Sequence, residues 1–273
     1  MKESSYGVFE QTQVTSDISR YVEEITTRGY AVIANLFSSA ELSEWRHKID
    51  KVYQQQEDAF GRDALIAIQD LDICRAPLLY DFEFIKLAAQ PFILTLIKQF
   101  LGEWFILNLQ NAIINRPNQV HHQSSWHRDL PYQNWVCSRP LAISALIAID
   151  EFSEVTGGTN LIPFTHKIEK MPSEEYISAN KIVVSAPAGS VIVFDAMLFH
   201  RGGSNRSHIV RRAVNHLYTI PIMKQQYDFP KALSSDLTLE PHIARLLGYT
   251  SQVPLNNNEW RELRLAREKL ITA

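Results

Sequence analysis

The sequence has few cysteines, little net charge and no long apolar run. Cys74 and Cys137 are the two thiols in 273 residues, and without a C-x-x-C pair they argue against a disulfide framework or a cysteine zinc site. A net charge of −3 leaves no basic excess to neutralise nucleic-acid phosphates. No apolar run approaches the ~18 residues of a membrane span, and no secretion signal is recognisable. These absences predict a cytoplasmic protein that acts on small molecules and binds neither nucleic acid nor membrane.

Helical spacing of apolar residues characterises the first 103 residues. One helix is expected to begin after Ser16 and a second after Ser38 or Ser39, because hydroxyl side chains cap helix starts. A third is predicted over residues 84–101. This N-terminal part is expected to pack outside a later β-core.

Short apolar runs of strand length dominate residues 104–221. They are separated by Pro, Gly, Asn and Ser clusters, which is typical of a jelly roll and not of βαβ units. The predicted strands are 105–109, 112–114, 142–149, 181–185, 191–194 and 213–220. We therefore predict a single domain, 1–273, that is mainly β with flanking helices (α+β). Its N-terminal helical part (1–103) precedes a double-stranded β-helix core (jelly-roll, cupin-like, 104–221). The C-terminal part (222–273) is expected to form a pocket wall or lid, followed by a helix.

Two histidines and one aspartate have the pattern of a metal site. His127 and Asp129 are two positions apart, so in an extended strand both side chains face one side while Arg128 points away. His200, after the apolar run 190–195, can supply a third ligand from another strand. Two imidazoles and one carboxylate suit a non-heme Fe(II) site with open coordination positions.

An arginine follows the metal set in a strand-like segment. A guanidinium grips a carboxylate through a bidentate fork, so an inward-facing Arg211 could hold the distal carboxylate of 2-oxoglutarate. Arg212 is its rival, but strand alternation lets only one of the two face the cavity. Further amides that could contact 2-oxoglutarate are Gln110 and Asn111, on the strand before the metal pair, and Asn215, on the face of Arg211.

The same residues also match the catalytic loop of protein kinases. Residues 127–134 read HRDLPYQN, which fits H-R-D-L-x-x-x-N. The chain has no Gly-rich loop, no V-A-I-K-type lysine, no D-F-G and no A-P-E. Without the groups that hold phosphate and magnesium, the loop alone cannot catalyse phosphoryl transfer, and we set the kinase interpretation aside.

From about residue 29 to residue 221 the chain resembles the phytanoyl-CoA dioxygenase family of Fe(II)/2-oxoglutarate-dependent oxygenases. Besides the metal set, the resemblance includes GYAVI at 29–33, INRP at 114–117 and GGTNLIPFTHK at 157–167. The last is similar to the family's N-G-x-L-x-x-x-P-G-S-H, with Phe and Thr in place of the usual Gly-Ser. The eleven-residue spacing from His200 to Arg211 is that of the family and favours Arg211 over Arg212.

The resemblance implies an enzyme that uses Fe(II), 2-oxoglutarate and O₂. His127, Asp129 and His200 would hold the iron and Arg211 the cosubstrate, and a small organic metabolite would be hydroxylated while 2-oxoglutarate is decarboxylated to succinate and CO₂. Related halogenases replace the strand carboxylate, so the presence of Asp129 indicates oxygenation. Desaturation or cyclisation in a biosynthetic pathway would use the same cofactors and stays open. So does a different class, a non-catalytic metal-binding jelly roll that acts as a sensor or interaction protein.

Residues that contact the substrate are expected on the loops between the ligand-bearing elements, at 68–80, 119–126, 131–139 and 201–210. The aromatic and arginine candidates there are Arg75, Trp126, Tyr132, Trp135, Arg139 and Arg201. Such side chains suit a polar or acid-bearing organic molecule with an apolar part. Metabolites, antibiotic intermediates, sugar acids and acyl-thioesters all fit this description. The sequence is compatible with any oligomeric state of the protein.

Overall fold

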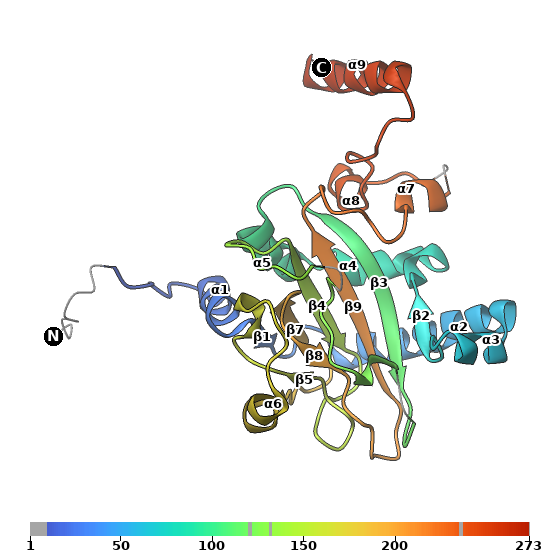
Figure 1. Ribbon diagram of the computed structural model, residues 1–273. Coiled ribbons are helices and arrows are strands. Elements are labelled where there is room, and N and C mark those ends of the chain that lie inside the picture. The colour runs from blue at the N-terminus through green and yellow to red at the C-terminus, as the bar shows by residue number, and fades with distance from the viewer. Residues whose placement is uncertain (1–9, 120–121, 131–132, 235–236, 273) are drawn as a thin grey trace.

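An antiparallel six-stranded sheet forms the centre of the fold (Figure 1), in a computed structural model that describes residues 10–119, 122–130, 133–234 and 237–272. The strand order is β1-β7-β4-β9-β3-β2. Its strands are β1 (Tyr30–Ile33), β2 (Ile73–Arg75), β3 (Ile106–Asn115), β4 (Ala142–Ala148), β7 (Val191–Asp195) and β9 (Arg211–Thr219). A second sheet, in the order β6-β5-β8, consists of β5 (Asn160–Leu161), β6 (Ile182–Val183) and β8 (His200–Arg201). Two antiparallel sheets with flanking helices confirm the α+β prediction and agree with a jelly-roll core.

The strand predictions were right for the long strands and incomplete for the short ones. The runs predicted at 105–109 and 112–114 form one strand, β3, with an irregularity in pairing between Leu107 and Leu109. The amides of Gln110 and Asn111, which suggested a break, are instead buried in the strand. β2, β5 and β8 have two or three residues each, too few to show the alternation by which a strand is recognised.

Helices cover one face of the large sheet. The α-helices of the described residues are α1 (Asp17–Arg28), α2 (Ser39–Phe60), α3 (Arg62–Ala67), α4 (Ile85–Ala88), α5 (Pro91–Leu101), α6 (Glu174–Asn180), α7 (Phe229–Ala232), α8 (Pro241–Leu246) and α9 (Asn257–Thr272), of which α6 and α9 lie away from this face. In Figure 1, α4 and α5 lie behind the sheet and α9 extends from the top of the molecule. The expected caps are present: the side chain of Ser16 accepts from the backbone of α1, and that of Ser38 accepts from the backbone of α2.

The third predicted helix, 84–101, is wrong as a single helix. It is divided into α4 and α5, because Pro91 lacks an N–H and begins a new helix that the Gln90 side chain caps. Within the described part of the chain, no single helix has the length and apolar character to cross a membrane. The bent pair Phe82–Ala88 and Pro91–Leu101, at 59°, passes that test together by length and composition only, and its side chains Ile93, Leu96 and Ile97 are buried in the core.

Strand alternation gives the two faces of the sheet different surroundings. Ala112 and Ile114 of β3 pack with the helices in the main core, whereas Ile113 belongs to a second cluster on the opposite face. In β9, Val214 and Tyr218 face the helices. The face without helices is therefore the one on which a cavity can open.

The buried carboxyl group of Asp195, at the end of β7, makes stability depend on pH. Its side chain accepts a hydrogen bond from the Met197 N–H at 2.9 Å, yet burial raises its pKa to about 6. The folded-state pKa lies above the unfolded value of about 3.9. The folded state therefore binds more protons between these two values, and stability falls as pH rises through that window.

Asp195→Asn should remove this loss. A shift of about two pKa units corresponds to at most roughly 3 kcal/mol above about pH 7, and to about half of that near pH 5. We expect thermal unfolding to show a larger gain for the variant at about pH 8 than at about pH 5. An equal change at both pH values would contradict this assignment.

Candidate metal centre

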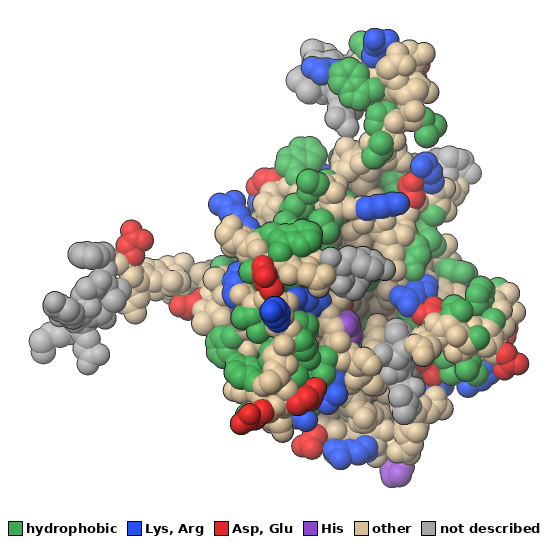
Figure 2. Space-filling model, viewed as in Figure 1, with side chains coloured by type: hydrophobic (Ala, Val, Ile, Leu, Met, Phe, Trp, Pro, Cys, Tyr) green, Lys and Arg blue, Asp and Glu red, His purple; other side chains and the backbone are tan. Residues whose placement is uncertain are grey.

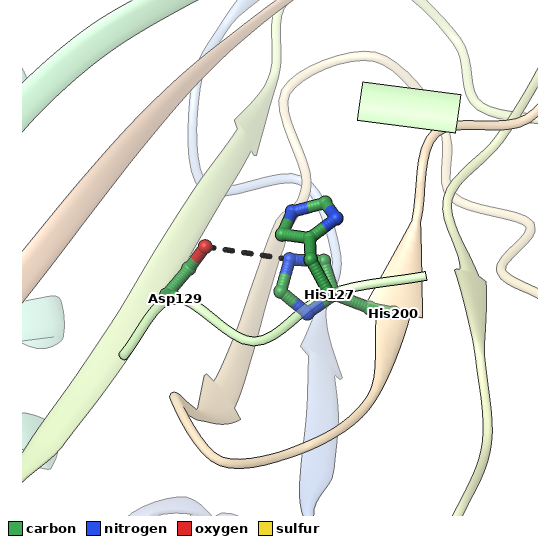
Figure 3. Close-up of side chains that lie close together, drawn as sticks. All are labelled: His127, Asp129 and His200. Carbon is green, nitrogen blue, oxygen red and sulfur yellow. Dashed lines mark ion pairs between the residues drawn. The ribbon is translucent and has the colours of Figure 1, made fainter. Parts of the chain in front are cut away.

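His127, Asp129 and His200 converge on one point (Figure 3). One ligand atom of each lies within 4.8 Å of those of the other two, and His200 Nε2 is 3.4 Å from Asp129 Oδ1. The centroids of the two imidazole rings are 4.3 Å apart. A metal bound at about 2.1 Å from each donor holds its ligands roughly 3 Å apart, so a small movement of one side chain completes the set.

Backbone pairing brings the three residues together. His127 N–H donates to His200 O at 2.9 Å and His200 N–H to His127 O at 3.0 Å, while Asp129 N–H donates to Ala196 O at 3.0 Å. The expected regular strand at 127–129 is wrong, because His127 forms only an isolated bridge to His200. The i, i+2 relation holds nevertheless, since the segment is extended enough to turn both side chains to one side.

Hydrogen bonds orient both imidazoles for a ligand role. His127 Nδ1 lies 2.8 Å from Ser125 O, and His200 Nδ1 lies 3.0 Å from Leu198 O. A carbonyl accepts only, so each Nδ1 carries a hydrogen, and Nε2 is the ring atom left to bind a metal ion. This is the tautomer that a metal-binding histidine uses.

Asp129 offers one carboxylate oxygen. Its Oδ2 accepts from Ser144 Oγ at 2.5 Å and from Asn215 Nδ2 at 3.3 Å, which leaves Oδ1 directed at His200. Burial alone would raise the pKa of Asp129, but the charges of His200 and His127 and the hydrogen bond from Ser144 hold it well below its usual range. The buried carboxyl group is therefore ionised and favours a cation.

Arg211 lines the same cavity as the three ligands. Its guanidinium is buried: Nη2 donates to Gly157 O at 2.8 Å, and Cζ lies 4.5 Å from the Phe152 ring centroid. Nε has no hydrogen-bond partner, and no described carboxylate forms an ion pair with Arg211. Burial lowers the pKa of Arg211 to about 10, so the group keeps its charge at neutral pH.

The neighbouring arginine faces the other way. Arg212 forms ion pairs with Asp50 at 2.8 Å and with Asp150 at 3.2 Å, on the helix side of the sheet. Alternation along β9 thus separates the two rivals, and Arg211 is the one that reaches the cavity.

The Arg211 contact depends on a close approach between two loops. Gly157 has φ +79°, and a Cβ at this position would lie 2.6 Å from the carbonyl oxygen of Gly203. Only glycine fits there, and its carbonyl is the one that Arg211 binds. The glycine run at 157–158 therefore has a steric reason.

The amides predicted to contact 2-oxoglutarate do not all reach the cavity. Asn215 lines it, and its Oδ1 is buried without a partner. Asn111 lies opposite Asn215 in the β3–β9 register and lines a larger neighbouring cavity. Gln110 is turned to the helix face, where Nε2 donates to Phe84 O at 2.9 Å and Oε1 accepts from Leu78 N–H at 3.2 Å. Its amide has a structural place in the core.

The substrate candidates are also divided. Arg75 and Trp135 line the larger cavity, and Arg201 lines the metal cavity with its guanidinium 4.6 Å from the Trp126 ring centroid. Arg139 lines a separate cleft with His166 and Lys167, away from the metal set. Tyr132 lies outside the described residues.

Three polar residues at the site were missed: Ser144, Asn115 and Thr159. Ser144 could have been found, because a hydroxyl in the middle of the apolar run 142–149 must have a hydrogen-bond partner. For the other two the sequence gives no such signal.

The comparisons with known proteins agree with this site. The family model described as Phytanoyl-CoA dioxygenase (PhyH) matches residues 25–213, more than half of the chain. The chain belongs to the phytanoyl-CoA dioxygenase family. This confirms the resemblance and makes the protein an oxidoreductase of the Fe(II)/2-oxoglutarate-dependent dioxygenases.

Relatives from bacteria and fungi support the same membership. The uncharacterized protein Rv1501 of Mycobacterium tuberculosis is 31% identical over 243 residues, 85% of this chain and 87% of that protein. The dioxygenase olcK of Penicillium canescens is 32% identical over 152 residues, 52% and 48% of the two chains. The crystal structure of EctD from S. alaskensis with 2-oxoglutarate and 5-hydroxyectoine superposes with a TM-score of 0.63 at 18% identity, over 77% and 80% of the chains. That likeness shows a shared fold.

Proposed function

We propose that this dioxygenase hydroxylates a small organic molecule at an Fe(II) ion held by His127, Asp129 and His200. One oxygen atom of O₂ would enter the product, and the other would enter succinate as 2-oxoglutarate loses CO₂. The observation that carries the proposal is the buried, unpaired guanidinium of Arg211 in the cavity of the metal ligands. A buried cation is costly unless an anion accompanies it, and a dicarboxylic cosubstrate supplies that anion.

The ligand set fits Fe(II). Two imidazoles whose Nδ1 atoms donate to backbone carbonyls and one ionised carboxylate are the donors of the facial triad, which would leave positions for other ligands. When bound, Fe(II) supplies the activation of O₂ that amino-acid side chains cannot provide. Ser144 and Asn215 hold Asp129 so that Oδ1 is presented.

Arg211 would fix the distal carboxylate, with its Nε–H available for a hydrogen bond. Asn215, whose Oδ1 lacks a partner among the described residues, lies on β9 with Arg211, lines the same cavity and donates to Asp129 Oδ2 at 3.3 Å. The cavity measures about 40 Å³ and shares His127, Asp129 and Asn215 with a larger neighbouring cavity, so bound 2-oxoglutarate would have room beyond it. Arg201, whose guanidinium stacks on the Trp126 ring, also lines it.

Slow succinate formation tests the proposal without knowledge of the substrate. The purified protein with Fe(II), 2-oxoglutarate and O₂ is expected to release succinate, because oxygenases of this kind turn over their cosubstrate weakly when no substrate is bound. Chelation of iron or exclusion of O₂ should stop the release. Binding of Fe(II) and 2-oxoglutarate without succinate would favour a sensor, and absence of both binding events would contradict the proposal.

With a substrate, a mass gain of one oxygen indicates hydroxylation, whereas loss of two hydrogens indicates desaturation or cyclisation.

A further inference from the structure

A second, larger cavity adjoins the metal centre. It measures about 800 Å³ and shares His127, Asp129 and Asn215 with the cosubstrate cavity, so a molecule inside it lies beside the metal ligands. Figure 2 shows a hollow in this face of the molecule, with a histidine side chain at its bottom and basic side chains near its edge. A cavity of this size holds a drug-sized molecule.

The inner wall of this cavity is apolar. Leu109 of β3, Leu217 of β9, Leu130 and Met223 belong to one hydrophobic cluster and line it together. Trp135, which is 54% exposed, adds an aromatic surface. An occupant with an apolar body is stabilised here, because its apolar surface is removed from water.

The wall opposite the metal is fixed in place. The side chain of Asn108 donates to Lys224 O at 2.9 Å, and Gln225 Nε2 donates to Leu107 O at 2.8 Å and to Leu247 O at 3.1 Å. These bonds attach residues 223–226 to β3, and all four residues line the cavity.

Most of the charged residues that line the cavity are cations. Apart from Asp129, no carboxylate among the described residues lines the cavity, whereas Arg75, Arg128 and Lys224 do. The guanidinium of Arg128 is turned away and donates to three backbone carbonyls, and that of Arg75 is bound to Asp70 through Nε and Nη2. Lys224 is exposed and forms no ion pair with the residues that the structure describes. Among the described cations that line the cavity, Lys224 is the one whose side chain has no hydrogen-bond or ion-pair partner.

We propose that the substrate is an organic monoanion, with an apolar body against Leu109, Leu217 and Met223 and an anionic group at Lys224. The inference rests on the proposed function in one respect, that a C–H bond of this molecule is the one oxidised. Binding itself requires only the cavity. An acyl-thioester of coenzyme A carries several phosphate charges, for which a mouth with one unpaired cation is poorly matched.

A pair of fluorescent probes tests the class of ligand. Anilinonaphthalene sulfonate has two apolar ring systems and one anionic group, and N-phenylnaphthylamine has the same skeleton without the charge. In titrations of the full chain we expect the sulfonate to saturate a single site and to bind more tightly than the neutral probe. Lys224→Gln should weaken sulfonate binding roughly fivefold, as for an exposed ion pair, and leave the neutral probe unchanged.

Two matched variants locate the binding. Lys51→Gln removes an exposed lysine of α2 outside the cavity and should change neither affinity. Met223→Trp narrows the cavity and should weaken both probes. Equal affinity for the two probes, or unchanged sulfonate binding in Lys224→Gln, would overturn the proposal.

Competition separates a free acid from a thioester. Decanoate is expected to displace the sulfonate probe at lower concentration than decanoyl-coenzyme A does, and the reverse order would overturn the single-anion assignment. Binding of 2-oxoglutarate in the presence of Fe(II) is measured on the same variants and should persist in Lys224→Gln. If neither the native protein nor any variant binds 2-oxoglutarate, while the two probes bind as expected, the proposed function is refuted and the inference about the cavity is not.

Discussion

Asp129→Ala is expected to abolish succinate formation and to weaken Fe(II) binding. The substitution removes the negative charge and the Oδ1 atom that lies 3.4 Å from His200 Nε2. Loss of an outer partner of a metal ligand commonly costs about 10–100-fold in affinity, and loss of the ligand itself should cost more. Because Asp129 is ionised in the folded protein, its removal also leaves Fe(II) without a neutralising charge. Isothermal titration with Fe(II) under anaerobic conditions and a succinate assay measure the two effects.

Three further variants show whether the effect is local. Asp129→Asn keeps the volume and an oxygen for Ser144 but not the charge, and should be as inactive as the alanine variant. Glu154→Ala removes an exposed carboxylate paired with Arg206 and should retain full activity. His200→Ala should match Asp129→Ala. Full activity in either ligand variant, with folding verified by thermal unfolding, would sink the assignment of the metal centre.

Arg211→Ala is expected to raise the KM for 2-oxoglutarate by at least roughly a hundredfold. A hydrogen bond to a charged group contributes about 1.5–3 kcal/mol, and a guanidinium can make two to one carboxylate. Each 1.36 kcal/mol corresponds to about a factor of ten. The buried position of Arg211, 3% exposed, keeps water from replacing the lost contact. Steady-state succinate formation over a range of 2-oxoglutarate concentrations gives the value.

Arg212→Ala is the matched control. It loses ion pairs with Asp50 and Asp150 on the opposite face, so some stability should be lost while the KM stays the same. A 2-oxo acid without the distal carboxylate, such as 2-oxovalerate, separates anchoring from a general defect. The native enzyme should prefer 2-oxoglutarate strongly over it, and Arg211→Ala should lose that preference. A preserved preference would show that another group anchors the cosubstrate.

The sequence predicted those parts of the site that depend on local spacing. His127 and Asp129 are two residues apart and Arg211 lies in a strand with an apolar pattern, so alternation alone decides which side chains share a face. Gln110 and Asn111 show the limit of this reasoning. Being adjacent, only one of them can face the site, and the choice is made by the pairing of Asn111 with Asn215 across β3 and β9. Pairing between strands a hundred residues apart is not visible in one sequence.

The substrate cavity could not be predicted for a related reason. Its walls combine β3, β9, residues 223–226 and the side chains of Leu130, Gln133 and Trp135, which meet only in the folded chain. Arg75, Trp135 and Arg139 were predicted to contact the substrate because they lie on connecting loops. Arg75 and Trp135 line the cavity, whereas Arg139 lines another cleft. Lys224 belongs to a segment with weak periodicity, which was predicted as a pocket wall or lid without a role for any single residue. The break at Pro91, by contrast, could have been predicted, because proline within a helical run ends or starts a helix.

The division of labour across β3 and β9 affects how such an enzyme can change over time. On these two strands, Leu109, Asn111, Asn215 and Leu217 line the cavity, whereas Ala112 and Val214 pack with the helices. A mutation at one of the cavity positions can change which substrate binds without disturbing the helices that pack on the other face of the sheet. Related chains can therefore differ in substrate and still share the same helix packing.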